Sequence, residues 1–96
     1  METLRILIAD DHPLFRHGIA ALLKAEPDFE VISEATNGKE VIELADSLQP
    51  DVIIMDIHMP EVNGIEATRR ILHTSPSIRI LIVTMFEDDN RHACRC

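Results

Sequence analysis

Three aspartates in this sequence are placed where they could do chemistry, because each lies at the end of a short apolar run. Asp10 and Asp11 follow residues 4–9, and Asp56 follows residues 52–55. Carboxylates that are crowded together repel one another, which raises the pKa of at least one of them unless a cation neutralises the group. Mg²⁺ prefers oxygen ligands and leaves positions open for phosphate oxygens. The aspartates therefore predict a metal-assisted phosphoryl-transfer site with Asp56 as the nucleophile.

The carboxylates can meet only if the apolar runs before them are neighbouring strands. Four runs rich in branched apolar residues predict strands at residues 4–9, 29–35, 52–55 and 78–83. Apolar residues at three- and four-residue spacing predict helices at residues 13–25, 41–49 and 65–72. This alternation favours an α/β fold with a doubly wound parallel sheet. In the flavodoxin-like strand order 2-1-3-4, the first and third strands are neighbours and their carboxyl ends meet.

Other side chains have expected positions in this fold. The first helix is expected to pack on the sheet through an apolar stripe that consists of Leu14, Phe15, Ile19, Leu22 and Leu23. Thr84 follows the fourth predicted strand, so its hydroxyl is expected at the same edge as the carboxylates. Three histidines are expected at the surface, without a part in the chemistry, namely His12, His17 and His73.

The composition indicates one globular domain and argues against several classes of protein. The 96 residues are 46% hydrophobic and 27% charged, which is typical of a folded chain. The net charge of -8 disfavours direct DNA binding, because DNA phosphates would be repelled. The apolar runs are far shorter than the roughly 20 residues that cross a bilayer. Cys94 and Cys96 lie too close together to staple a fold, so a cytoplasmic, reducing location is expected.

Several strings of residues resemble the receiver domains of bacterial response regulators (CheY-like domains). The resemblance is to the subgroup that carries a LuxR-type (NarL/FixJ) helix-turn-helix. The strings are ILIADDHPLFR at residues 6–16, MDIHMP at 55–60 with NGIEA at 63–67, and ILIVTMF at 80–86. The resemblance covers residues 1–89 as a partial receiver domain without the family's fifth strand and fifth helix, and residues 90–96 do not resemble the family.

The resemblance implies a role for each site residue. Asp56 would be the phosphoacceptor of a two-component phosphorelay, and Thr84 would be the switch hydroxyl that moves towards the phosphoryl group. Asp11 would bind Mg²⁺ directly, Asp10 would act on it through water, and the backbone carbonyl of His58 would be a third ligand. A sensor histidine kinase is the implied phosphodonor. The implied function is signalling that regulates transcription in a longer parent protein, and the domain itself would not be an enzyme.

A second interpretation stays open. In the family, the fifth strand ends in a lysine that contacts the phosphoryl group, whereas the only lysines here, Lys24 and Lys39, belong to the first and second helical segments. The chain could then bind Mg²⁺ or a partner without lasting phosphorylation. The fourth strand would be an exposed edge, which favours a homodimer or an edge-paired oligomer. An aspartate-dependent phosphatase is disfavoured, because it needs an acid where this chain has His58.

Overall fold

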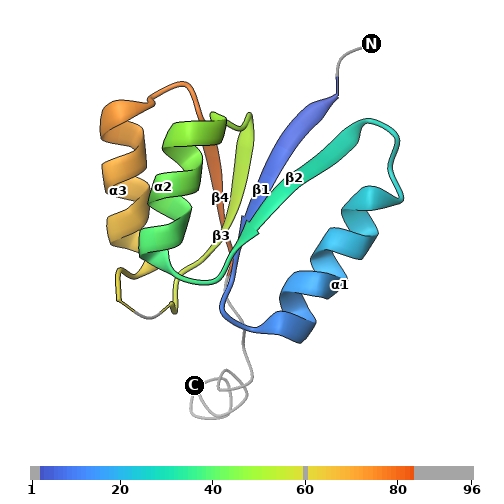
Figure 1. The fold of residues 1–96 in the computed structure, drawn as a ribbon, viewed down its shortest axis with the longest axis horizontal. Helices are drawn as coiled ribbons and strands as arrows, with labels where there is room; N and C mark the ends of the chain where they lie inside the picture. Colours follow the sequence, from blue (N-terminus) through green and yellow to red (C-terminus); the bar gives the residue numbers. More distant parts are fainter. Residues whose placement is uncertain (1–2, 60, 84–96) are drawn as a thin grey trace, which may run out of the picture.

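Strands and helices alternate along the computed structural model, which describes residues 3–59 and 61–83 (Figure 1). Within these ranges the elements are β1 (Leu4–Ala9), α1 (Pro13–Lys24), β2 (Phe29–Ala35), α2 (Gly38–Leu48), β3 (Val52–Asp56), α3 (Gly64–Thr74) and β4 (Arg79–Val83). The predicted alternation is confirmed, although β3 includes Asp56 and β4 starts one residue later than predicted. None of the described helices combines the length and the apolar character needed to cross a membrane.

The four strands are parallel and lie in the order β2-β1-β3-β4, which confirms the flavodoxin-like fold. The pairing of β1 with β3 decides where the acidic residues lie. Ala9 at the end of β1 is paired with Met55 of β3. Because Asp10 and Asp56 each follow this pair by one residue, both lie at the same end of the sheet, where the carboxyl ends of its strands meet.

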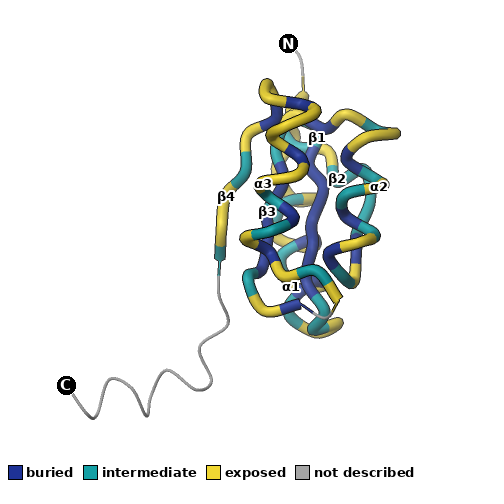
Figure 2. The backbone as a smooth tube through the Cα atoms, turned by 90° about the vertical axis from the view of Figure 1, so that its left-hand side faces the viewer, coloured by how far each residue is buried: buried dark blue, intermediate teal, exposed yellow. Residues whose placement is uncertain are grey.

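Helix α1 covers one face of the sheet, and helices α2 and α3 cover the other (Figure 1). The apolar cluster under α2 and α3 is the larger one, and Leu7 and Ile53 lie at its centre. The smaller cluster lies under α1 and contains Ile6 and Ile8. Residues 6–9 of β1 are all buried, so this strand is covered on both faces (Figure 2). This burial of apolar surface is the main force that holds the strand ends in place.

The apolar stripe predicted for α1 is wrong at two positions. Leu14 and Leu22 point to solvent and are 87% and 74% exposed. The helix contacts the rest of the molecule through Arg16, Ile19, Ala20 and Leu23, so the predicted positions of Ile19 and Leu23 are confirmed. These residues follow the three- and four-residue spacing of one helix face. The apolar pattern was misleading because one position of the buried face is an arginine.

Asparagine side chains fix the starts of α2 and α3. The Oδ1 atom of Asn37 accepts a hydrogen bond of 2.8 Å from the backbone N–H of Glu40, and Asn63 caps α3 in the same way. Gly64, the first residue of α3, packs against the backbone of Asp56. A Cβ atom at Gly64 would overlap the carbonyl oxygen of Asp56. Helix α3 therefore begins directly against the strand end that carries Asp56.

Strand β4 is an edge of the sheet within the described part of the chain. It pairs with β3 on one side, and no described strand pairs with its other side. Leu81 and Ile82 are 56% and 36% exposed. The homodimer or edge-paired oligomer predicted from such an edge stays a prediction. Thr84, its following loop and residues 90–96 lie outside the described residues.

Candidate metal centre

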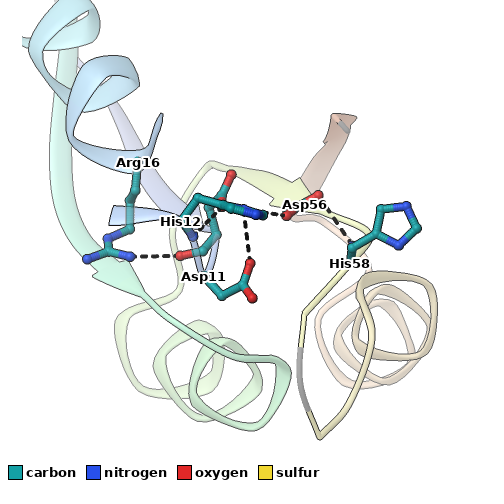
Figure 3. Close-up of polar contacts among 6 residues, drawn as sticks. Asp11, His12, Arg16, Asp56 and His58 are labelled. Atoms are coloured by element: carbon teal, nitrogen blue, oxygen red, sulfur yellow. Dashed lines mark hydrogen bonds and ion pairs between the residues drawn. The ribbon is translucent and has the colours of Figure 1, made fainter. Parts of the chain in front are cut away.

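Three aspartates and a histidine converge where β1 and β3 end. One potential ligand atom from each of Asp10, Asp11, His12 and Asp56 lies within 4.8 Å of those of the other three. Figure 3 shows how the side chains of His12 and Asp56 approach each other from the two strand ends. The sheet order explains this convergence, because β1 and β3 are paired up to the residues just before Asp10 and Asp56.

The carboxylates are buried without enough hydrogen-bond donors. Asp10 and Asp56 are 1% and 0% exposed, whereas the side chain of Asp11 is partly exposed. One buried oxygen of each carboxylate, namely Asp10 Oδ2, Asp11 Oδ1 and Asp56 Oδ2, has no hydrogen-bond partner among the described residues. Burial of a charged oxygen without a partner is costly, so such oxygens are usually neutralised by a proton or a cation.

The environment of Asp56 disfavours its ionised form. Burial raises the pKa of this carboxyl group above its ordinary value of 3.8, and the negative charge of Asp10 raises it further. The backbone N–H of His58, which donates a hydrogen bond of 3.3 Å to Asp56 Oδ1, lowers the pKa but does not reverse the shift. Asp56 is therefore a carboxylate that a nearby positive charge would help to ionise.

His12 belongs to this cluster, which the sequence analysis did not predict, although its side chain is 40% exposed, as expected of a surface residue. Its Nδ1 atom lies 2.9 Å from Asp10 Oδ1, 3.1 Å from Asp11 Oδ1 and 3.7 Å from Asp56 Oδ2. The contact with Asp10 is the main cause of a raised His12 pKa. A signal was present in the sequence. The backbone N–H of a residue two positions after an aspartate can bond its carboxylate, as His12 does at 2.8 Å.

Arg16 is a further residue that the sequence analysis missed. It is 9% exposed, and its Nη1 atom donates a hydrogen bond of 2.8 Å to the backbone carbonyl oxygen of Asp10 (Figure 3). Its Nε atom donates to Glu34 Oε1 at 2.9 Å. The guanidinium group thus ties the loop after β1 to the end of β2. Its two contacts hold the backbone of Asp10 next to the end of β2.

The other predicted site residues are only partly placed. The backbone N–H of His58 contacts Asp56, and the imidazole of His58 points away from the carboxylates (Figure 3). The roles proposed for the His58 carbonyl and for the Thr84 hydroxyl remain predictions, and Thr84 lies outside the described residues.

The donor set fits a hard divalent cation such as Mg²⁺. Its fit rests on the unpartnered oxygens of Asp10, Asp11 and Asp56, which face one another in a small space. Mg²⁺ is commonly bound through one or two carboxylates and fills its remaining positions with water and phosphate oxygens. A bound ion would neutralise the carboxylates and polarise a phosphoryl group.

A parallel sheet of this order with buried aspartates at the ends of β1 and β3 defines a flavodoxin-like α/β domain with an acidic site at the carboxyl ends of its strands. A family model described as the response regulator receiver domain matches residues 6–95. The chain belongs to this family.

Two relatives that match most of the chain are named as transcriptional regulatory proteins. The transcriptional regulatory protein DegU from Brevibacillus brevis is 42% identical over 87 residues, which are 91% of this chain and 37% of that protein. LiaR from Bacillus subtilis is 47% identical over 88 residues, which are 92% of this chain and 42% of that protein. The chain therefore spans about two fifths of the length of these relatives.

A solved structure agrees with this assignment. The crystal structure of a LuxR-family two-component response regulator from Aurantimonas sp. SI85-9A1 matches with a TM-score of 0.83 and 36% identity. The match covers 98% of this chain and 69% of that chain. The resemblance to LuxR-type receiver domains that the sequence indicates is thereby confirmed.

Proposed function

We propose that this chain accepts a phosphoryl group on Asp56 in an Mg²⁺-dependent reaction with a sensor histidine kinase. The observation that carries the proposal is a buried Asp56 whose Oδ2 atom has no hydrogen-bond partner among the described residues and lies beside Asp10 and Asp11. The family's part in two-component signalling supports the kinase as the donor. A cytoplasmic location follows from the proposal, because the kinase would present its phosphohistidine there.

The chemistry is a single displacement at phosphorus. An oxygen of Asp56 attacks the phosphorus of the donor phosphohistidine, and a new O–P bond forms as the N–P bond breaks. The electron pair of that bond stays on the donor imidazole, which takes up a proton. Mg²⁺, held by Asp10, Asp11, Asp56 and the carbonyl of His58, would offset the negative charge that gathers there. Thr84 would then bond a phosphoryl oxygen and shift the following loop.

The output would be the regulation of transcription in a longer protein. The names of DegU and LiaR describe them as transcriptional regulatory proteins, which supports this output. The chain itself would neither bind DNA directly, given its net charge of -8, nor act as an enzyme on other substrates. Its role would be that of the phosphorylated module.

A second candidate is a domain that binds Mg²⁺ or a partner without lasting phosphorylation. The exposed Leu81 and Ile82 on β4 would then support a homodimer or an edge-paired oligomer.

Labelling with acetyl phosphate and Mg²⁺ separates these functions. Intact-protein mass spectrometry should detect one added phosphoryl group in the wild-type chain and in Asp46→Asn, whose substituted residue is exposed on α2. Asp56→Asn should gain none. Equal labelling of Asp56→Asn would overturn the assignment of the phosphoacceptor. Mg²⁺ binding by the wild-type chain with no labelling would favour the second candidate.

A further inference from the structure

Helix α2 begins directly against the loop that leads from β3 into α3. A Cβ atom at Gly38, the first residue of α2, would overlap the backbone carbonyl oxygen of Val62. Gly64, two residues after Val62, packs in the same way against the backbone of Asp56. The start of α2, residues 62–64 and the end of β3 are therefore stacked backbone against backbone, at the end of the molecule where both helices begin (Figure 1).

The backbone of this loop has a conformation that needs support from its surroundings. Glu61, which directly precedes Val62, has a φ of 70°, in the left-handed region that is unfavourable for a residue with a side chain. Such a conformation persists where contacts on both sides fix it. The side chain of Val62 packs against the apolar cluster under α2 and α3, and the backbone N–H of Gly64 donates a hydrogen bond of 2.9 Å to the carbonyl oxygen of Ile57. The loop is therefore held from both sides.

The first turn of α2 is fixed more firmly than the loop. The Oδ1 atom of Asn37 accepts a hydrogen bond of 2.8 Å from the backbone N–H of Glu40, and Glu40 Oε1 accepts one of 2.7 Å from the backbone N–H of Thr36. These bonds between the two ends of the first turn act as a capping box. Val41, in the same turn, is fully buried in the apolar cluster. A methyl group at Gly38 would therefore displace the loop more readily than the helix.

A displaced loop would move the backbone around the reacting carboxylate. His58 belongs to this loop, and its backbone N–H donates a hydrogen bond of 3.3 Å to Asp56 Oδ1. We propose that Gly38 is a positioning residue, which holds Asp56 in place by fixing the loop after β3. It acts through Val62 and Gly64 and touches no reacting atom. This inference rests on the proposed function and adds the start of α2 to the elements that set the geometry of its site.

The test compares Gly38→Ala with Ala45→Gly, each made in the full chain. Ala45 is a buried residue in the last turn of α2, so its replacement weakens the same helix at the end away from the loop. Both variants are labelled with acetyl phosphate and Mg²⁺ at a temperature at which circular dichroism shows them to be folded. Gly38→Ala should be labelled about tenfold or more slowly than the wild type, because small misplacements of reacting groups slow a reaction strongly. Ala45→Gly should keep the wild-type rate.

Nuclear magnetic resonance tests the positioning itself, without a phosphodonor or a metal ion. The backbone amide of His58 reports on the loop, because its hydrogen bond to Asp56 Oδ1 changes when the loop moves. In ¹⁵N-labelled chain, Gly38→Ala should shift the His58 amide resonance, and Ala45→Gly should leave it in place. A purely structural role of Gly38 would lower stability without moving this resonance in the folded chain.

The outcomes separate this inference from the proposed function. A wild-type labelling rate and an unshifted His58 amide in Gly38→Ala would overturn the positioning role alone. If Gly38→Ala does not fold, Asn37→Ala takes its place, since the loss of the cap loosens the same turn. Slower labelling of that variant would support the role, and a wild-type rate would overturn it. If the wild-type chain were not labelled at all, the proposed function would fail, and the His58 amide would still decide the role of Gly38.

Discussion

The Nη1 atom of Arg16 donates a hydrogen bond of 2.8 Å to the backbone carbonyl oxygen of Asp10. This bond joins a buried cation on α1 to the loop that carries two of the three carboxylates. Because the same guanidinium also bonds Glu34, its position is fixed from both sides. Arg16 is thus a positioning residue, which acts on the metal centre through the backbone of Asp10.

Substitution Arg16→Met should therefore affect both stability and metal binding. It removes the donor to the buried Asp10 carbonyl, which costs roughly 1–3 kcal/mol, and the ion pair with the partly exposed Glu34 carboxylate. Urea unfolding should detect that loss, and calorimetry should detect weaker Mg²⁺ binding. Arg70→Met removes an exposed ion pair with Glu66, so it should change stability by less than about 1 kcal/mol. Equal effects of the two substitutions would refute the positioning role.

Substitution Asp56→Asn should stabilise the metal-free protein at neutral pH. Burial and the charge of Asp10 raise the Asp56 pKa in the folded state above 3.8. The raised pKa means that protonated Asp56 stabilises the folded state. This stabilisation is fully present below pH 3.8 and is lost as the pH rises through the pKa that Asp56 has in the folded state. Asparagine carries no charge at neutral pH, so the free energy of unfolding of Asp56→Asn should exceed that of the wild-type chain.

Thermal unfolding in the presence of a chelator checks this prediction. Asp46→Asn, at an exposed position of α2, should stay within about 0.5 kcal/mol of the wild type. Added Mg²⁺ should stabilise the wild type more than Asp56→Asn, because a ligand stabilises only the folded state that binds it. A lower unfolding temperature for metal-free Asp56→Asn would contradict the account of the buried charge.

Stability of the metal-free chain should also fall as the pH rises from near neutrality. The contact with Asp10, helped by the charges of Asp11 and Asp56, raises the His12 pKa above 6.5 in the folded state. The stabilisation that protonated His12 contributes to the folded state is fully present below pH 6.5. It is lost as the pH rises through the pKa that His12 has in the folded state. His12→Ala should flatten this dependence in urea-unfolding experiments, whereas His73→Ala on α3 should not. If the stability of His12→Ala fell with pH as steeply as that of the wild type, the contact between His12 and Asp10 would not be the cause of the pH dependence.

The sequence was sufficient to predict the fold and the meeting of Asp10, Asp11 and Asp56. Apolar runs locate buried strands, and the 2-1-3-4 order of a doubly wound sheet brings the ends of the first and third strands together. These inferences use local patterns and a general rule of topology. They do not depend on the direction of any single side chain.

The positions of the Arg16 side chain and the His12 ring depend on contacts that apolar periodicity does not reveal. Arg16 is buried because its partner Glu34 lies 18 residues away on β2. Apolar periodicity treats an arginine as exposed, so it assigned Leu14 and Leu22 to the buried face. The ring of His12 is turned inward by carboxylates from two different strands. Such directions are settled only once the strands have been brought together.

The two glycines Gly64 and Gly18 should respond to alanine in opposite ways. Gly64→Ala places a Cβ atom against the backbone of Asp56, so we expect a loss of roughly 1–3 kcal/mol and weaker Mg²⁺ binding as α3 is pushed from the strand end. Gly18 lies inside α1 with no atom within 4 Å of a built Cβ, so Gly18→Ala should add about 0.5–1 kcal/mol. Urea unfolding and calorimetry measure both. A neutral Gly64→Ala would mean that α3 can withdraw without disturbing Asp56.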